Sequence, residues 1–517
     1  MSEKREHWGS SIGVILAVAG SAVGLGNFLR FPAKATLNGG GAFMIPYFIA
    51  FLLLGIPLMW VEWTLGRMGG AHGEGTAPGI FNHISRRPIF RYLGTIGILG
   101  PFVILIYYMY VESWSLAYAW FSFTGKLFQA PDQSMMKAFL SGYQGLEQNQ
   151  FFSSLGPAYV FFLITFLLNF YFIYKGVQGG IEMLSKIGMP ILVVIGIALA
   201  ARVLMLGTPD PTHPELSVKN ALGFVWNPDF SKLTDAKVWL EAAGQIFFTL
   251  SVGIGVILTY ASYLKRNDDV TLSGLSAAAT NEFCEVILGG SIVIPAAFVF
   301  FGAAGALSIA QSGTFNIGFV SMPLIFDKLP AGFLFSGLWF ILLFLAGITS
   351  SVSLIQPAIA FLEDEFKMSR RKSTVVLGLV AFLACQPVIF FLAHGFLDEL
   401  DFWGGTFFLV VFATIEIFLF VVVYGMDRGW KEMHVGARIK IPSFYKVVIK
   451  YITPAYLLIM LVTWTYQQFV PTFLLEGVTD DNRPYVWGAR ALIFGLWSLI
   501  IILVAIVWRR RSKEGKA

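Results

Sequence analysis

Two short stretches decide the fold: SAVGLGN at residues 21–27 and LSVGIG at residues 250–255. Each places Val-Gly-x-Gly after a small polar residue in the middle of a long apolar segment. Glycine inside a helix costs about 1 kcal/mol relative to alanine and frees the backbone to leave helical geometry. The matched stretches therefore predict two helices that are interrupted at corresponding positions. For either stretch alone, tight packing of small residues such as Gly20 and Gly24 is the competing explanation.

The composition places these stretches in lipid. Of the 517 residues, 56% are hydrophobic and 13% are charged, whereas soluble chains carry about 25% charged residues. A water-soluble fold could not bury so much apolar surface, which excludes a soluble enzyme and a disordered scaffold. The two cysteines, Cys284 and Cys385, both lie in apolar runs, which excludes a disulfide-built secreted domain and a cysteine-rich metal site.

A helix needs about 20 apolar residues to cross the hydrocarbon core of a bilayer. By this measure we predict an all-α membrane protein with twelve transmembrane helices. The predicted spans cover residues 11–36, 41–66, 92–124, 157–174, 187–206, 237–263, 274–303, 332–361, 373–392, 401–424, 447–470 and 485–508.

The distribution of Lys and Arg predicts the orientation. With a cytoplasmic N-terminus, the inner segments hold most of the 36 basic residues, and outer loops carry acids such as Asp398, Glu476 and Asp480. We therefore expect a multi-pass protein of the cell inner (plasma) membrane with both termini in the cytoplasm. Basic tails at that surface are expected to bind anionic lipid of the bilayer, so they require no nucleic acid as a partner.

The two interrupted spans open two halves of five spans each, residues 11–206 and 237–424. Because five is odd, the second half must insert upside down, which predicts a 5+5 inverted repeat. The remaining segments are a cytoplasmic N-terminal segment at 1–10, an extracellular loop at 207–236, and two further spans with a basic cytoplasmic tail at 425–517.

A broken helix exposes free N–H groups at one end and free C=O groups at the other. Lipid cannot satisfy these groups, so a bound solute or ions must do so. Paired glycine interruptions in corresponding spans are typical of transporters whose site lies at the bilayer midplane. The N–H end favours an anionic group, and the C=O end favours a cation.

Oxygen-bearing side chains cluster near the interruptions. They are Asn27, Thr249, Ser251, Asn281, Thr349, Ser350 and Ser351. Hydroxyls, amides and carbonyls with few carboxylates suit a monovalent cation such as Na⁺, whereas calcium prefers several carboxylates and zinc prefers His or Cys. For each residue alone, a hydroxyl bonded to its own helix is the ordinary alternative.

Charges within the spans predict two gates. Arg30 follows the first interruption, and Asp401 at the start of span ten is its expected partner. Arg5 and Trp8 lie at the opposite end, where Asp364 ends span eight. Anchoring of these basic and aromatic residues at the membrane interface is the alternative.

Two acids, Glu62 and Glu285, lie within spans two and seven. Charge at that depth costs at least about 2.5–3.5 kcal/mol, so these acids need a partner or a role. A proton site and a hydrogen-bonded structural acid both remain open.

Five motifs resemble the neurotransmitter:sodium symporter family: KREHW (4–8), AVGLGNFLRFP (22–32), NGGGAF (38–43), GQIFFTLS (244–251) and DFW (401–403). The resemblance extends over essentially the whole chain. It implies a LeuT-like fold with spans 1 and 6 unwound at the midplane. It also implies sodium-coupled symport of a neutral hydrophobic amino acid into the cell by alternating access.

The resemblance implies two Na⁺ sites and one substrate site. The first Na⁺ site comprises Ala22, Asn27, Thr249 and Asn281 with the substrate carboxylate, and the second comprises Gly20, Val23, Ala346, Thr349 and Ser350. The substrate carboxylate would contact the amides of Leu25 and Gly26 and the Tyr108 hydroxyl. The ammonium would contact carbonyls of Ala22, Phe248 and Thr249 and the Ser251 hydroxyl. The side chain would occupy a pocket formed by Ile104, Tyr108, Phe248, Ile254, Ser350 and Leu354.

Further roles follow from the same resemblance. Arg30 and Asp401 would form the outer gate with Phe248 as a lid. The inner gate would comprise Arg5, Asp364, Trp8, Ser262, Tyr263 and Gln356. Glu285 occupies the position of a small hydroxyl residue in chloride-dependent members, which implies chloride-independent transport. Ile254 departs from the aromatic residue of leucine-transporting members, which implies a hydrophobic amino acid but not leucine specifically.

Other classes of protein fit less well. The run GSSIG at 9–13 matches a serine-nucleophile pattern without a preceding strand, no His-Glu-x-x-His occurs, and GRMGG at 66–70 lacks the ending of a phosphate-binding loop. We therefore expect no enzymatic activity. The remaining functional alternative is a sodium-dependent amino-acid sensor without net transport. For the oligomeric state, both a monomer and a homodimer remain open.

Overall fold

The computed structural model describes residues 6–514 and consists of helices joined by loops. Among these residues there is no β-strand, and the isolated β-bridge found in them joins Gly40 to Pro228. The predicted all-α class is confirmed for the described part of the chain.

The helices that precede the second interrupted pair are α1 (Ser11–Ala22), α2 (Leu25–Leu37), α3 (Met44–Ala50), α4 (Ile56–Ala71), α5 (Ala77–Ile84), α6 (Pro88–Leu93), α7 (Ile96–Phe123), α8 (Gln133–Tyr143), α9 (Gly156–Tyr174), α10 (Met183–Leu204) and α11 (Val218–Trp226). The helices from that pair onward are α12 (Ala236–Leu250), α13 (Val256–Ala261), α14 (Val270–Glu282), α15 (Gly290–Gln311), α16 (Thr314–Asn316), α17 (Met322–Asp327), α18 (Gly332–Leu354), α19 (Gln356–Phe366), α20 (Arg370–Phe390), α21 (Phe396–Leu400), α22 (Phe408–Phe418), α23 (Met426–Met433), α24 (Phe444–Val447), α25 (Thr453–Trp464), α26 (Val470–Phe473) and α27 (Arg483–Lys513). Short 3₁₀ and π-helical turns join several of them into longer helices.

Ten helices in the described part are long and apolar enough to cross a membrane, and α1 with α2, bent by 51°, makes an eleventh. The sixth predicted span, 237–263, is divided between α12 and α13, each shorter than a crossing. The largest difference in a boundary is at 187–206, where the continuous helix runs from Val177 to Leu204. This helix accommodates polar residues in its first turns because Glu182 and Lys186 form an ion pair at 2.6 Å.

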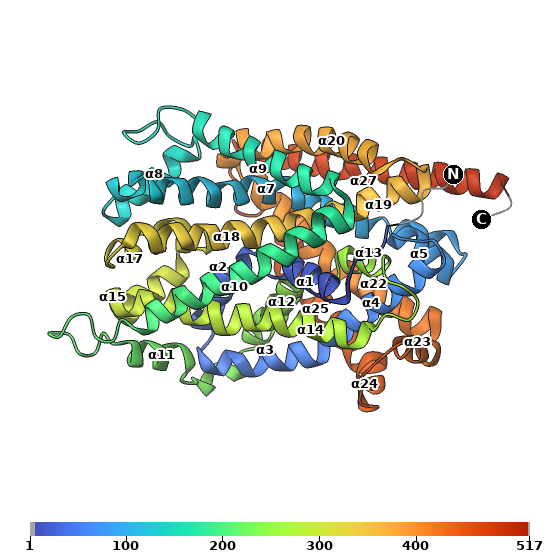
Figure 1. Cartoon of the computed structure of the whole chain (residues 1–517), viewed down its shortest axis with the longest axis horizontal. Helices are drawn as coiled ribbons and strands as arrows, with labels where there is room; N and C mark the ends of the chain where they lie inside the picture. Colours follow the sequence, from blue (N-terminus) through green and yellow to red (C-terminus); the bar gives the residue numbers. More distant parts are fainter. Residues whose placement is uncertain (1–5, 515–517) are drawn as a thin grey trace.

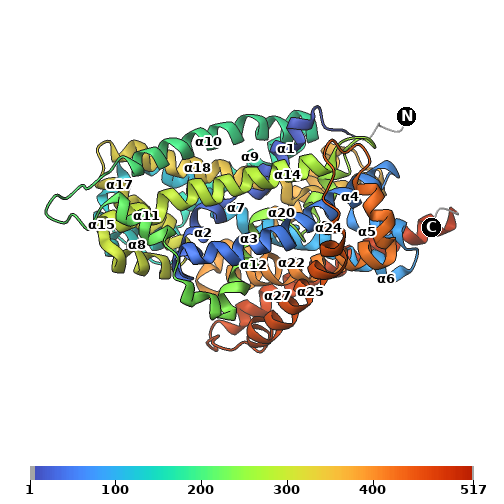
Figure 2. The same cartoon turned by 90° about the horizontal axis from the view of Figure 1, so that it is seen from below.

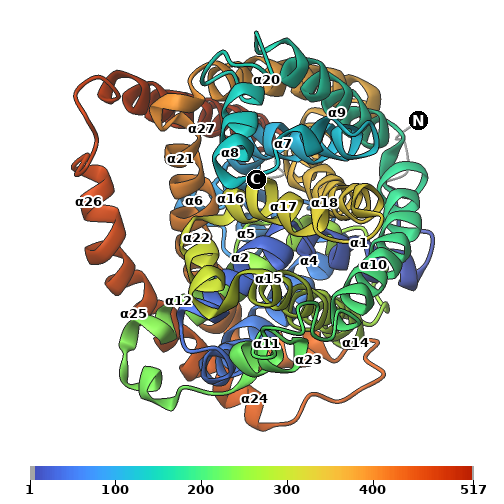
Figure 3. The same ribbon diagram turned by 90° about the vertical axis from the view of Figure 1, so that its left-hand side faces the viewer.

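The long helices run roughly parallel to the longest axis of the molecule, and α1, α13 and α18 lie near the middle of the view (Figure 1). Viewed along the helices, α25, α26 and α27 lie at one edge of the bundle (Figure 3), and the second view places α25 and α27 at its rim as well (Figure 2). In the 18-residue apolar window of the helix at 332–366, 78% of the residues are buried within the protein. The corresponding share for α27 is 22%. The helix at 88–123, which contains α7, is 72% buried by the same measure. These two helices are therefore the most enclosed of the long apolar helices in the described part of the chain, and α27 presents most of its surface to the lipid.

The first interruption separates α1 from α2 at two residues. Val23 and Gly24 both adopt extended backbone conformations, with ψ of 100° at Val23 and φ of −127° at Gly24. The side-chain oxygen of Asn27 accepts a hydrogen bond from the Gly24 N–H at 2.8 Å, which caps the first turn of α2. The chain thus leaves and re-enters helical geometry within the motif at 21–27.

The second interruption separates α12 from α13 over residues 251–255. Ser251, Gly253 and Gly255 have φ of 53°, 76° and 82°, in the left-handed region that glycine enters without steric cost. A Cβ atom on Gly255 would lie 2.4 Å from the carbonyl oxygen of Gly97 on α7. Both the backbone conformation and the close packing therefore require glycine at residue 255.

Candidate functional site

The two interruptions lie against each other. The Ser251 hydroxyl donates a hydrogen bond to the carbonyl oxygen of Ser21 at 3.0 Å, across 230 residues of sequence. Behind the second interruption, the N–H of Gly253 donates to the Glu62 carboxylate on α4 at 2.5 Å. Glu62 is fully buried and thus satisfies a backbone donor of the unwound segment between α12 and α13.

A cavity of about 60 Å³ lies between the interruptions. It is lined by Ser21, Ala22, Gly24, Leu25, Gly26, Asn27, Ile104, Tyr108, Phe248, Ser251, Ile254, Ser350, Leu354, Gly405 and Leu409. Every residue predicted to bind the substrate, except Thr249, is among them. None of these described lining residues has a charged side chain, so a charged substrate side chain would lose its hydration without a compensating partner.

Sequence reasoning missed Gly405 and Leu409, which reach the cavity from span ten. The adjacent glycines Gly404 and Gly405 are the sequence signal for close packing of span ten against α7. In the structure, a Cβ atom on Gly405 would lie 3.0 Å from the Tyr107 hydroxyl. Thr249, in contrast, points away from the cavity toward the acid Glu285.

The beginning of α2 presents backbone N–H groups to the cavity. The Leu25 N–H lies 3.4 Å from the hydroxyl oxygen of Tyr108 on α7. A Cβ atom on Gly26 would lie 2.4 Å from the Phe248 ring, so that ring covers the first turn of α2. The N-terminal end of a helix attracts anionic groups, and this end is suited to a carboxylate.

One cluster of oxygens surrounds the hydroxyl of Ser350 on α18. Carbonyl oxygens of Ala346, Gly20 and Val23 lie 3.0, 3.2 and 3.3 Å from Oγ of Ser350. The Thr349 hydroxyl lies 3.3 Å from the same Ala346 carbonyl. A single hydroxyl proton can bond only one of these oxygens, so the uncharged donor set fits a monovalent cation.

A second cluster joins α2, α12 and α14. The Asn27 amide nitrogen lies 3.2 Å from the Thr249 hydroxyl and 2.9 Å from the side-chain amide of Asn281. The other amide atom of Asn281 lies 2.9 Å from the Thr249 hydroxyl. The Glu285 carboxylate accepts hydrogen bonds from Thr249 and from Gln245, so a buried acid lies directly behind this cluster.

The Tyr47 hydroxyl donates to Glu282, one turn before Glu285 on the same helix, at 2.7 Å.

Within the described residues, no group of three or more His, Cys, Asp or Glu side chains is placed to hold a metal ion. The two oxygen clusters are therefore the candidate cation sites of the described chain.

A larger cavity of about 450 Å³ lies next to the first and is lined by Arg30, Lys34, Lys237, Leu240, Glu241, Gly244, Thr406, Trp464, Gln467 and Gln468. The Arg30 guanidinium lies 4.5 Å above the centre of the Phe248 ring, so this pair separates the two cavities. Asp401 instead accepts a hydrogen bond from the Tyr107 hydroxyl at 2.6 Å. Among the described contacts there is no direct Arg30–Asp401 ion pair, because each residue is held by an aromatic neighbour.

On the opposite side of the small cavity, Trp8 is buried. Its indole N–H donates to the carbonyl oxygen of Tyr260 at 2.8 Å, and the two rings pack edge to face. The Gln356 amide donates to the Tyr263 hydroxyl at 2.6 Å and thereby joins α19 to the end of α13. These contacts attach the segment before α1, and α19, to α13.

Arg5 lies outside the described residues, so its predicted pairing with Asp364 stays a prediction. Sequence reasoning missed Arg370, which donates to the Gln356 side chain at 2.9 Å and to the carbonyl oxygen of Ile173 at 2.9 Å. Nothing in the local sequence marks Arg370, because it lies in a run of basic residues at the start of α20.

Comparisons with known proteins agree with this geometry. The model of the sodium:neurotransmitter symporter family matches residues 5–136 and 130–513. An uncharacterized sodium-dependent transporter of Methanocaldococcus jannaschii is 29% identical over 460 residues, 87% of this chain and 88% of that protein. One of Bacillus subtilis is 30% identical over 417 residues, 80% of this chain and 85% of that protein. The crystal structure of MhsT in complex with L-phenylalanine superposes with a TM-score of 0.75 at 29% identity, covering 89% of this chain and 99% of MhsT.

Proposed function

We propose, because the chain belongs to the sodium:neurotransmitter symporter family, that it imports a neutral hydrophobic amino acid together with Na⁺. The resemblance found in the sequence is confirmed by this membership. The chain is a multi-pass membrane protein of a sodium-dependent transporter family, not an enzyme. The observation that carries the more specific proposal is the uncharged cavity between the two interrupted helices, with backbone N–H groups on one side and oxygen clusters beside it.

In the proposed architecture the chain crosses the bilayer twelve times, with α1–α2 and α12–α13 as spans 1 and 6, unwound at the midplane. The first ten spans form the 5+5 inverted repeat. Both termini are cytoplasmic, so Trp8 lies on the inner side of the substrate cavity and Arg30 on the outer side. The cell inner membrane is the proposed location.

The substrate is proposed to bind as a zwitterion. Its carboxylate would contact the N–H groups at the start of α2 and the Tyr108 hydroxyl, and its ammonium would contact carbonyls at the ends of α1 and α12 and the Ser251 hydroxyl. The uncharged pocket favours a hydrophobic side chain. L-phenylalanine bound to MhsT supports substrates as large as an aromatic amino acid.

Two Na⁺ ions are proposed as co-substrates. The Asn27–Thr249–Asn281 cluster, with the Ala22 carbonyl and the substrate carboxylate, would bind the first ion. The cluster around Ser350 would bind the second. Two charges moving through about 100 mV release about 4.6 kcal/mol, enough to sustain a gradient of a neutral zwitterion of roughly a thousandfold.

Alternating access would use the two closures described above. Phe248 and Arg30 would cover the substrate on the outer side, with Asp401 beside them. Trp8, Tyr263 and Gln356 would close the inner side, with Arg5 and Asp364. Opening only one side at a time commits the ions and the substrate to move together.

Uptake into proteoliposomes tests the proposal. With an inward Na⁺ gradient, radiolabelled neutral amino acids such as phenylalanine, leucine and alanine should accumulate, and glutamate and lysine should not. Replacing Na⁺ by K⁺ should abolish accumulation. Sodium-dependent binding without accumulation would instead support the alternative of an amino-acid sensor, since both would bind but only a symporter concentrates its substrate.

Replacing Tyr108 with phenylalanine should weaken substrate binding about 10- to 150-fold, because one hydrogen bond to a charged carboxylate contributes about 1.5–3 kcal/mol. Equilibrium binding of radiolabelled phenylalanine measures the change. Tyr110→Phe is the matched control, since Tyr110 lies on the same helix and its buried hydroxyl has no hydrogen-bond partner in the described structure. Equal affinities of the two variants would contradict the carboxylate site.

Replacing Ile254 with phenylalanine should shift selectivity from aromatic to small aliphatic substrates by about 10-fold or more, because the added ring fills part of the pocket. Competition of phenylalanine and alanine for labelled substrate measures the ratio. An unchanged ratio would place the substrate side chain elsewhere.

A further inference from the structure

The C-terminal end of α27 is attached to two distant segments by one arginine. Arg511 donates from its two terminal nitrogens to both oxygens of Glu74, at 2.7 and 3.2 Å, and to Glu365 at 2.7 Å. The basic tail was expected to bind anionic lipid. Arg511 instead points into the protein, where its side chain is only 23% exposed.

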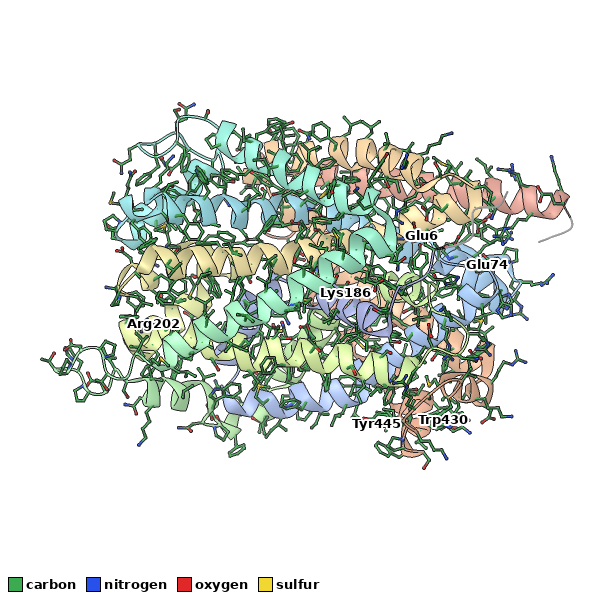
Figure 4. The ribbon with its side chains drawn as sticks, in the orientation of Figure 1. Glu6, Glu74, Lys186, Arg202, Trp430 and Tyr445 are labelled. Carbon is green, nitrogen blue, oxygen red and sulfur yellow. The ribbon has the colours of Figure 1, made fainter. Side chains whose placement is uncertain are left out.

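The two acids belong to different parts of the bundle. Glu74 follows α4, and Glu365 lies near the end of α19, next to the predicted gate residue Asp364. Figure 4 labels Glu74 and Glu6 at the same end of the molecule, opposite Arg202. The bridge therefore lies on the face where the N-terminal segment closes the passage.

Glu74 is coupled to α13 through α4. A Cβ atom on Gly66 would lie 2.3 Å from the carbonyl oxygen of Leu258, and one on Gly70 would lie 2.0 Å from that of Ser262. Backbones this close move together, because packed interiors deform little. Glu74 is therefore expected to move together with α13, the helix against which Trp8 packs.

Glu365 belongs to the other side of the passage, on α19. The start of α19 meets the end of α13 through the Gln356–Tyr263 hydrogen bond. The Glu365 side chain is 2% exposed, and among the described residues Arg511 is its ion-pair partner. A buried carboxylate that loses its cation is strongly destabilised, so this contact favours one arrangement of the two sides.

We propose that Arg511 is a positioning residue of the inner gate, holding the inner face closed by bridging Glu74 and Glu365. The inner passage opens when α13 separates from α19, and Arg511 must then release one of the two acids. This inference rests on the proposed transport function, and it adds the end of α27 to the gate.

Accessibility of a buried cysteine tests the proposal. Ser353 is buried near the end of α18, close to the start of α19, and its hydroxyl lies 2.7 Å from that of Ser21, which lines the substrate cavity. The reporter is a Ser353→Cys protein in which Cys284 and Cys385 are replaced by serine. The rate at which a polar thiol reagent labels this cysteine is measured on detergent-solubilised protein, once in K⁺ and once in Na⁺. We expect Arg511→Gln and Glu365→Gln to raise the labelling rate in K⁺ about tenfold, Arg511→Lys to raise it less, and Na⁺ to reverse the increase.

Arg510→Gln is the matched control, because Arg510 is an exposed cation next to Arg511 and should leave the rate unchanged. A second control retains Cys385 as the single cysteine, since this thiol is fully buried on α20 and becomes reactive only on general unfolding. Equal labelling rates in the Arg511→Gln and Arg510→Gln proteins would overturn the proposal, and so would an increase that appears equally at Cys385. Labelling does not require transport, so a failure of sodium-driven uptake in the wild-type protein would refute the proposed function separately.

Discussion

Asn27→Ala is expected to abolish sodium-stimulated substrate binding. The Asn27 side chain contacts both Thr249 and Asn281, and these residues are the proposed ligands of the first ion. Because the substrate carboxylate is proposed to complete this site, loss of the ion removes a substrate contact as well. A contact with a charged group contributes about 1.5–3 kcal/mol, so the apparent Na⁺ affinity should fall by about 10- to 150-fold, and no stimulation should remain at Na⁺ concentrations that just saturate the wild-type protein.

Binding of radiolabelled phenylalanine, titrated with Na⁺ at constant ionic strength, measures this effect. Asn169→Ala is the matched control, since Asn169 is an equally buried amide that bonds Glu112 away from the cavity. Asn27 also caps α2, so the melting temperatures of both variants in K⁺ show whether folding has changed. An unchanged sodium dependence in a folded Asn27→Ala protein would contradict the first ion site.

Glu285→Ser is expected to make transport depend on chloride. Glu285 is buried and accepts hydrogen bonds from Thr249 and Gln245, so its negative charge lies beside the first proposed ion. Two unit charges about 5 Å apart interact by about 3 kcal/mol at an effective dielectric constant of about 20. Without that charge, uptake in chloride-free medium should fall about 100-fold, and chloride should restore most of it.

Uptake measured in chloride and in gluconate separates the outcomes, and the wild-type protein should show no difference between them. Glu282→Ser is the control, because Glu282 is a buried acid on the same helix that contacts Tyr47 and not Thr249. Chloride dependence in the wild-type protein, or its absence in an active Glu285→Ser protein, would refute the role of Glu285.

Local features of the chain made the helices predictable. Hydropathy located the apolar segments, and the glycines at 24, 253 and 255 marked where the structure interrupts two of them, because backbone freedom is a property of the residue itself. The boundaries were less predictable. The helix that begins at Val177 extends ten residues beyond the predicted start, because its polar first turns are stabilised by contacts that hydropathy does not register.

Contacts between distant residues were harder to predict. The family resemblance supplied most of the residues that line the cavity. It did not supply Ser21 and Gly24 of the first interruption, nor Gly405 and Leu409, which carry no distinctive side chain. The sequence also suggested a direct Arg30–Asp401 pair, whereas the structure places Arg30 over Phe248 and bonds Asp401 to Tyr107. Opposite charges near the same membrane surface do not reveal which neighbour each will prefer.

The sequence by itself determined that this protein consists of membrane helices, that two of them contain glycine interruptions, and that its motifs match one family. The family resemblance supplied the residues around Ser350 and the acid Glu285. Only the tertiary structure decided that Glu285 bonds Thr249 and Gln245, and that Arg511 of the last helix reaches Glu74 and Glu365. The physical reason is the range of the interactions. Transfer into lipid and backbone freedom act on neighbouring residues, whereas these contacts join segments tens to hundreds of residues apart and exist only once the helices have packed.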